Sequence, residues 1–327
     1  MRKKSDQRMM TASEVGLSHF DFQNSKGLLC ESPTSLQFIG PLNFGLTLRR
    51  FQAYGEDAAN RFDGVTFQKV FQFNGALYLL SISEDNGNPV LTVHPDRRKI
   101  EIHNIAERIA RKILGLDFDL VRFYQMAKDD PILKPLTERF HGMRPTLSAD
   151  LFEILITSIT AQQINLQFAF TVRSRLIRRY GETLNYKGEK YFAFPSPEKL
   201  SRARVQTLRK LQFTERKAEY IIDLSKRIRD GNLNLTNLQT ASEEEIHETL
   251  TQSRGIGRWT VDWFLARGLG KGSAFPAGDL GVAKAVQHFY FNEEKQPEEK
   301  LRDFAKRWGD FQNLATHYLL AGYYIDK

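Results

Sequence analysis

The sequence predicts an α+β fold, in which a small antiparallel β-sheet domain precedes a larger helical domain. Between residues 46 and 93, short runs rich in aromatic and β-branched residues alternate with turn-forming pairs such as Asn-Gly, which is typical of β-hairpins. From about residue 104 the spacing of apolar residues changes to that of amphipathic helices. The 327 residues are enough for two or three domains, each with its own core.

The first part of the chain divides into an extension and a β-rich domain. Residues 1–38 mix charge, Ser and Gly without periodicity, so we expect an N-terminal extension there. Residues 39–103 are expected to form the antiparallel β-rich domain, with hairpin turns at Asn74-Gly75 and at residues 86–89. The expected strands cover residues 46–51, 66–73, 76–82 and 90–93.

Residues 104–327 are expected to form the helical domain. Several of its segments begin with Ser, Asp or Thr, which are common N-cap residues. The expected helices cover residues 104–114, 119–128, 149–180, 197–210, 215–229, 242–252, 258–267, 279–291, 296–306 and 310–323.

Composition restricts the function classes. The 47 Lys and Arg exceed the 39 Asp and Glu by eight, which permits a polyanionic partner such as nucleic acid without requiring one. A single cysteine, Cys30, excludes an intramolecular disulfide, a cysteine-rich zinc site and a four-cysteine iron–sulfur cluster. The longest uncharged stretch, residues 154–172, carries too many polar groups for a membrane span, and no secretory signal opens the chain. We expect a globular cytoplasmic protein.

A glycine-containing turn carries the first functional signal. Gly255-Ile256-Gly257 lies between two helical patterns, and the second helix is expected to begin near Arg258. Free N–H groups in the first turn of a helix bind phosphate well, and Arg254 and Arg258 would add charged contacts. A plain helix–helix corner closed by a glycine is the alternative interpretation.

The residues that follow the turn carry a second signal. Trp259 and Trp263 are four positions apart, so both rings should lie on one face of the helix. A Gly/Pro-containing loop then leads to Asp279, twenty residues after Trp259, where another helix begins. Taken alone, Asp279 is typical of an N-cap.

Together, the hairpin, the loop and Asp279 resemble the helix-hairpin-helix DNA glycosylase superfamily, and most of all its 3-methyladenine DNA glycosylase II branch. The resemblance covers roughly residues 40–325 and includes the segment 158–165. It implies that Asp279 is the catalytic carboxylate, which would stabilise an oxocarbenium-like sugar and orient a water. It also implies a pocket for a flipped, cationic base, made by the aromatic residues Trp259, Trp263, Phe311 and Phe51. Ordinary core packing remains the alternative for Phe311 and Phe51.

Position 259 bears on the mechanism. By the resemblance, relatives that also cut the DNA strand carry a lysine there, whose amine forms a Schiff base with the sugar. This chain has Trp259, and the neighbouring Arg258 is a poor nucleophile because its guanidinium stays protonated. We therefore expect a hydrolase without lyase activity and without an iron–sulfur cluster.

The resemblance also suggests which residues contact DNA. At the hairpin these are Arg254, Gly255, Gly257, Arg258 and Thr260, and backbone carbonyls of Gly255 and Gly257 are candidate ligands of a monovalent cation. No side chains are expected to hold a metal. Gln162 and Gln163 align with the element that fills the gap left by a flipped base. Gln163 departs from the apolar residue often found there and could hydrogen-bond the unpaired base; a solvent-facing helix start is the alternative.

Three functions are compatible with these features. The first is a monofunctional DNA N-glycosylase that excises alkylated purines, of the 3-methyladenine type, from duplex DNA in base excision repair. It would act as a monomer on damaged DNA, with no membrane partner, and would be nucleoid-associated in a bacterium. The second is an oxidised-base glycosylase of the same fold, of the 8-oxoguanine type. The third is a non-catalytic helix-hairpin-helix DNA-binding protein.

Overall fold

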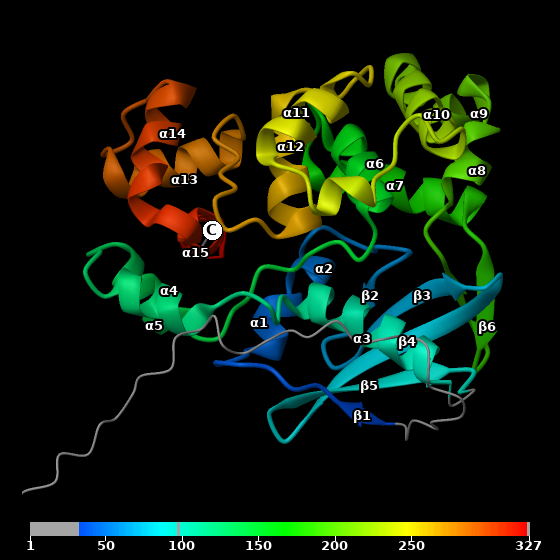
Figure 1. Ribbon diagram of the computed structural model, residues 1–327, viewed down its shortest axis with the longest axis horizontal. Coiled ribbons are helices and arrows are strands. Elements are labelled where there is room, and N and C mark those ends of the chain that lie inside the picture. Colours follow the sequence, from blue (N-terminus) through cyan, green and yellow to red (C-terminus); the bar gives the residue numbers. More distant parts are fainter. Residues whose placement is uncertain (1–32, 97–98, 326–327) are drawn as a thin grey trace, which may run out of the picture.

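The computed structural model describes residues 33–96 and 99–325 and confirms the predicted α+β fold. A five-stranded antiparallel sheet is followed by a large set of helices (Figure 1). Cys30 and residues 1–32 of the expected extension lie outside the described residues. Within the described part of the chain, no helix combines the length and the apolar character needed to cross a membrane.

The sheet has the strand order β1-β5-β4-β3-β2. Both predicted hairpin turns are confirmed: Asn74 and Gly75 have φ of 47° and 75°, and Asn86 and Gly87 have φ of 49° and 78°. Positive φ at both central residues is what a two-residue hairpin turn requires. The strands are β1 Thr34–Ser35, β2 Arg61–Phe62, β3 Phe67–Phe73, β4 Ala76–Asp85 and β5 Asn88–His94.

The prediction of a strand at residues 46–51 was wrong, because this segment is helical. It forms α1 (Phe44–Leu48) and α2 (Arg50–Ala53), and the Asn43 side chain caps α1 by accepting from the Leu46 N–H. The buried residues Phe44, Leu48 and Phe51 follow helical spacing and pack toward the sheet.

Each face of the sheet is covered. Helix α3 (Ile100–Leu114) packs on the face that carries Leu80 and Ile82, so it belongs with the sheet by packing rather than with the later helices. A second hairpin, β6 (Thr183–Tyr186) and β7 (Glu189–Phe192), packs near Val70 and Leu79. This hairpin lies between the helices predicted over residues 149–180 and 197–210, where the sequence pattern indicates no strand.

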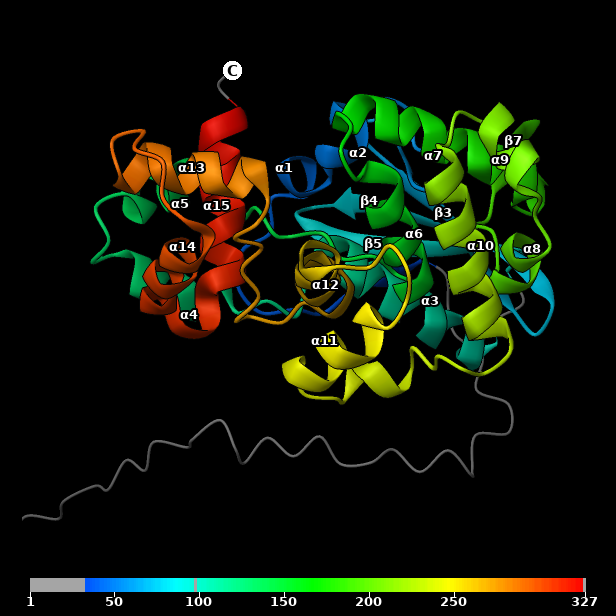
Figure 2. The same ribbon diagram turned by 90° about the horizontal axis from the view of Figure 1, so that it is seen from above.

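The remaining helices form two clusters (Figure 2). Helices α6 to α12 build the first cluster; α4 and α5 pack with the C-terminal helices α13 to α15 in the second. Trp263 packs against both clusters. The bounds are α4 Leu120–Ala127, α5 Leu133–Arg139, α6 Leu151–Ala161, α7 Leu166–Tyr180, α8 Pro197–Ser201, α9 Val205–Lys210, α10 Glu215–Arg229, η1 Asn237–Gln239, α11 Glu243–Thr251, α12 Arg258–Trp263, the π-helix η2 Phe264–Leu269, α13 Leu280–Tyr290, α14 Glu298–Ala305, η3 Lys306–Phe311 and α15 Gln312–Tyr324.

The predicted single helix over residues 149–180 is divided into α6 and α7. Gln162 leaves the helical conformation (φ −54°, ψ 129°), and Gln163 takes a positive φ of 57°. Asn165 then starts α7 as an N-cap, with its side chain accepting from the Phe168 N–H at 2.8 Å. The break leaves a short turn, residues 162–165, which we call the plug turn.

A buried charge network joins the sheet domain to the first helical cluster. Arg173 of α7 pairs with Asp57 and with Glu153 of α6, and Lys69 of β3 donates to Glu153 at 2.8 Å. Asn60 donates to the same Glu153 carboxylate at 2.8 Å. Burial opposes ionisation of Glu153, but Lys69 and Arg173 outweigh it and lower its pKa.

Candidate active site

Asp279 is the N-cap of α13, as its position in the sequence indicates. Its Oδ1 accepts hydrogen bonds from the backbone N–H groups of Gly281 at 2.8 Å and Val282 at 3.1 Å. The side chain is therefore held at the start of the helix, where the dipole favours a negative charge. The next residue, Leu280, is 69% exposed, so the cap lies at the protein surface.

The other carboxylate oxygen of Asp279 is held by the two tryptophans of α12. The Nε1 groups of Trp259 and Trp263 donate to Oδ2 at 2.9 Å and 3.2 Å. The predicted placement of both rings on one face of the helix is thus observed, and their N–H edges converge on Asp279. Four N–H donors fix the orientation of this half-buried carboxylate. It lies where the two helical clusters meet.

Phe311 and Phe51, the other two aromatic residues predicted for the base pocket, lie in different parts of the structure. Phe311 is half-buried in the second cluster, with its ring centroid 6.0 Å from that of Phe123 and with the Arg122 guanidinium 5.9 Å from its ring. Phe51 lies in the core of the sheet domain, with its ring centroid 4.9 Å from that of Phe67. Core packing is therefore the interpretation that fits Phe51, and we leave it out of the proposed base pocket.

Two residues near the site gave no signal in the sequence. The Arg267 guanidinium lies 5.5 Å from the Trp263 ring centroid and donates to Asn313 Oδ1 at 2.7 Å. Burial and the nearby Arg50 lower the pKa of Arg267 to about 9. Tyr324 borders Asp279 from α15; burial, Tyr323 and the Asp279 charge raise its pKa. Arg267 follows Trp263 by four residues in the same segment, whereas Tyr324 comes from α15 and reaches Asp279 only through the fold.

The glycines of the hairpin have different roles. Gly255 has φ of 82°, and a Cβ there would lie 2.1 Å from Cδ2 of Tyr220, so a larger residue would collide with α10. Gly257 has an extended backbone as the N-cap of α12, and a Cβ on it would meet open space. Close packing thus requires glycine at position 255 only.

The hairpin arginines are exposed but engaged with carboxylates. Arg254 pairs with Glu219 at 3.1 Å and Asp223 at 3.2 Å, both on α10. Arg258 pairs with Glu299 at 2.8 Å on α14. Exposed pairs of this kind are weak, so phosphate groups can compete for these arginines.

Thr260 and Gln162, predicted as DNA contacts, point into the protein instead. Thr260 is buried, and the Gln162 amide donates to Gly255 O at 2.8 Å and to Thr260 Oγ1 at 3.3 Å. Their side chains therefore link the plug turn to the hairpin, which corrects the expectation for both residues. Gln163, in contrast, is exposed at the tip of the turn.

The carbonyls named for a monovalent cation already accept protein hydrogen bonds. Gly255 O accepts from Gln162, and Gly257 O accepts from the N–H groups of Thr260 at 3.0 Å and Val261 at 3.1 Å within α12. Each carbonyl is thus engaged within the protein, and the cation site at the hairpin stays a prediction. In the described ranges, no three His, Cys, Asp or Glu side chains are grouped to hold a metal ion.

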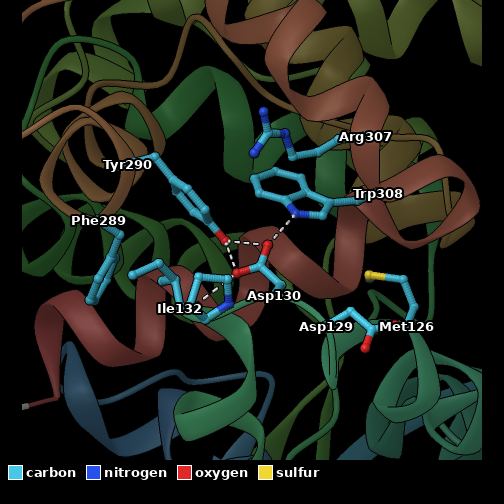
Figure 3. Close-up of a pocket in the computed structure, with 9 residues that line it drawn as sticks. Met126, Asp129, Asp130, Ile132, Phe289, Tyr290, Arg307 and Trp308 are labelled. Atoms are coloured by element: carbon cyan, nitrogen blue, oxygen red, sulfur yellow. Dashed lines mark hydrogen bonds between the residues drawn. The ribbon is translucent and has the colours of Figure 1, made fainter.

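A cavity of about 510 Å³ lies elsewhere, at the C-terminal end of α13 (Figure 3). Asp130 in its wall accepts from the Ile132 and Leu133 N–H groups at 2.9 Å and 3.0 Å, in the turn that leads into α5. The Tyr290 hydroxyl donates to the same carboxylate, and burial and Asp130 raise the pKa of Tyr290. Because α13 spans about 16 Å at 1.5 Å per residue, this cavity is distinct from the Asp279 site.

Comparison with known proteins agrees with this architecture. Residues 156–310 match the HhH-GPD superfamily base excision DNA repair protein family, and residues 47–155 match the N-terminal domain of 8-oxoguanine DNA glycosylase. A DNA-3-methyladenine glycosylase of Bacillus subtilis is 33% identical over 204 residues, which are 62% of this chain and 67% of that protein.

Two solved structures share the fold. A 3-methyladenine DNA glycosylase from Archaeoglobus fulgidus has a TM-score of 0.80 and 29% identity, over 89% of this chain and 99% of that one. An 8-oxoguanine glycosylase/lyase of Clostridium acetobutylicum bound to DNA has a TM-score of 0.72 and 21% identity, over 90% and 98%. The chain therefore belongs to the HhH-GPD superfamily of base excision DNA repair proteins and is a DNA glycosylase.

Proposed function

We propose that this protein is a monofunctional DNA N-glycosylase that excises alkylated purines from duplex DNA. The observation that carries the proposal is the Asp279 carboxylate, which is oriented by the N–H groups of Trp259 and Trp263 at the surface where the two clusters meet. The relatives named 3-methyladenine glycosylases support the choice of substrate class.

In the proposed reaction, the damaged nucleotide first leaves the base stack, because its glycosidic bond is inaccessible in the duplex. As that bond breaks, positive charge develops on the sugar, and the Asp279 carboxylate stabilises it and orients the attacking water. An alkylated purine already carries positive charge, so it leaves without a strong general acid. Trp259, Trp263 and Phe311 offer electron-rich faces on which such a base can stack.

The absence of lyase activity is part of the proposal. A lyase step requires an amine that attacks the sugar, and position 259 holds tryptophan. Arg258, beside it, is a guanidinium and remains protonated.

The proposed DNA contacts are Arg254 and Arg258, which would exchange their carboxylate partners for phosphates on either side of the hairpin. The N–H groups at the start of α12, after Gly257, would add to this anchor. Gln163 would enter the gap left by the flipped base and offer its amide to the unpaired partner base. The protein would act as a monomer on damaged duplex DNA and needs no metal or other cofactor for these steps.

A second candidate function is excision of an oxidised purine. The match of residues 47–155 to the N-terminal domain of 8-oxoguanine DNA glycosylase favours it. Such a base is neutral, so its departure needs more help from the protein than a cationic base does.

A panel of duplexes tests the proposal, each with one methylated, deaminated or oxidised base, with borohydride added in parallel to trap covalent adducts. We expect release of the methylated purines and no trapped adduct. Preferential release of 8-oxoguanine together with a borohydride-trapped adduct would favour a bifunctional oxidised-base enzyme. DNA binding without release of any base would identify a non-catalytic binding protein.

A further inference from the structure

The plug turn has a conformation that the chain does not favour by itself. Gln163 has φ of 57°, in the left-handed region that non-glycine residues rarely adopt. Such a conformation persists only where neighbouring contacts hold it. Since α6 ends at Ala161, the carbonyl groups at this end also need donors from outside the helix.

Lys217, in the first turn of α10, supplies those donors. Its ammonium group donates to Thr160 O at 2.8 Å and to Gln162 O at 2.6 Å. A cation is favourable at this point because the C-terminal end of α6 carries partial negative charge. The Lys217 side chain is half-buried, and burial lowers its pKa.

Gln162 connects the same turn to the hairpin. Its amide donates to Gly255 O at 2.8 Å, while the ring of Tyr220, on α10, packs against Gly255. Lys217 and Tyr220 are three positions apart and therefore share one face of α10. The views in Figures 1 and 2 place α10 beside α6, and one helix thus contacts both the plug turn and the hairpin.

We propose that Lys217 and Gln162 are positioning residues, which fix the plug turn relative to the hairpin before DNA binds, so that Gln163 is held ready for insertion. Neither side chain needs to touch DNA. The advantage is preorganisation, because the entropy cost of ordering the turn is met on folding and not on binding. This inference rests on the proposed function, since it assumes that a base is flipped and released.

The test compares base release from duplex DNA with release of the same methylated base from single-stranded DNA, where no partner base is left unpaired. Loss of a hydrogen bond to a charged group costs about 1.5–3 kcal/mol, or at least about tenfold in rate. We expect Lys217→Met to lower duplex kcat/KM about tenfold, and Gln162→Leu, which removes hydrogen bonds between neutral groups, to lower it roughly a few-fold. Both should change single-strand release less than about twofold. Lys217→Arg, which keeps donors at the carbonyls, should recover part of the loss.

One control variant and one further measurement separate loss of plug-turn positioning from a general loss of activity. Lys226→Met changes an exposed lysine on the same helix and should leave both substrates unaffected. Fluorescence of a 2-aminopurine opposite the damaged base should report weaker unstacking with Lys217→Met than with the parent protein.

Equal losses on both substrates, or no loss on either, would overturn the positioning role while leaving the glycosylase intact. A parent protein that releases no base from either substrate would instead contradict the proposed function.

Discussion

Asp130 and Asp279 lie near opposite ends of α13 and have almost the same hydrogen bonds. Each accepts two backbone N–H groups through Oδ1, Asp279 as the N-cap of α13 and Asp130 in the turn that leads into α5. Each also accepts from a tryptophan, Asp130 from Trp308 at 3.5 Å and Asp279 from Trp259 at 2.9 Å. Hydrogen-bond saturation alone therefore does not distinguish a catalytic carboxylate from a structural one.

The difference lies in which elements meet at each carboxylate. The donors to Asp130 come from the second cluster alone, so Asp130 holds that cluster together. The donors to Asp279 come from α12 in the first cluster and from α13 in the second. Asp279 also lies close to the hairpin that precedes Trp259. Position between the clusters, rather than local geometry, is what favours a catalytic role for Asp279.

Glu153 sharpens the comparison, because its partners are buried cations instead of N–H dipoles. We expect Glu153→Gln to lower the free energy of unfolding by about 3–5 kcal/mol, since Arg173 and Lys69 would be left without their shared carboxylate. The folded-state pKa of Glu153 is lowered, so its contribution is present above the unfolded-state pKa and is lost as pH falls through the folded-state value. Thermal melts of both proteins between neutral and acidic pH measure this. An unchanged Tm at neutral pH would contradict the structural role of the network.

The indole N–H groups at Asp279 provide the next largest effect. Changing Trp259 and Trp263 together to Phe keeps both rings but removes two hydrogen bonds to the carboxylate. At about 1.5 kcal/mol each, base release should fall roughly 10²-fold. Trp308→Phe, the matched change at Asp130, should leave base release unchanged. Equal losses of base release in the double variant and in Trp308→Phe would contradict the assignment of a catalytic role to Asp279 and a structural role to Asp130.

Asp130→Ala tests whether the role of Asp130 is structural and not catalytic. Loss of the two hydrogen bonds in the turn that leads into α5 should lower the free energy of unfolding by about 1–2 kcal/mol, while kcat/KM stays unchanged. Chemical denaturation and a base-release assay on the same sample measure both quantities. A folded variant without activity would show that Asp130 takes part in catalysis.

The smallest effects are expected at the exposed arginines. Arg258→Gln should weaken DNA binding a few-fold and reduce the slope of log Kd against log salt by about one. Glu299→Gln, which removes the nearer of the two carboxylates paired with Arg258, should strengthen binding at low salt. An unchanged salt slope for Arg258→Gln would place Arg258 outside the DNA interface.

Much of the fold could be predicted because local patterns agree with it. The Asn-Gly pairs determine the hairpin turns, and the α12 spacing places Trp259 and Trp263 on one face. The strand predicted at residues 46–51 failed because Asn43 starts a helix and the buried residues follow helical spacing. The break after Ala161 was missed because Lys217, more than fifty residues away, stabilises it.

The site was only partly predictable for the same reason. Asp279, the tryptophans and Arg267 belong to one continuous segment, whereas Tyr324 reaches the site from α15 through tertiary packing. The resemblance suggested that Gln162 contacts DNA, yet its amide donates to Gly255 O. Side-chain direction in a turn depends on neighbours that a single sequence does not identify.

The most direct measurement is single-turnover release of a methylated purine from duplex DNA by Asp279→Asn, with Asp130→Asn as the matched control. Asparagine keeps an oxygen that can accept the two backbone N–H groups at each position but removes the negative charge. By analogy with the loss of one transition-state hydrogen bond, Asp279→Asn should be slower by at least roughly 10²–10³-fold, and Asp130→Asn should match the parent protein. Full activity of a correctly folded Asp279→Asn protein would contradict the assignment of Asp279 as the catalytic carboxylate.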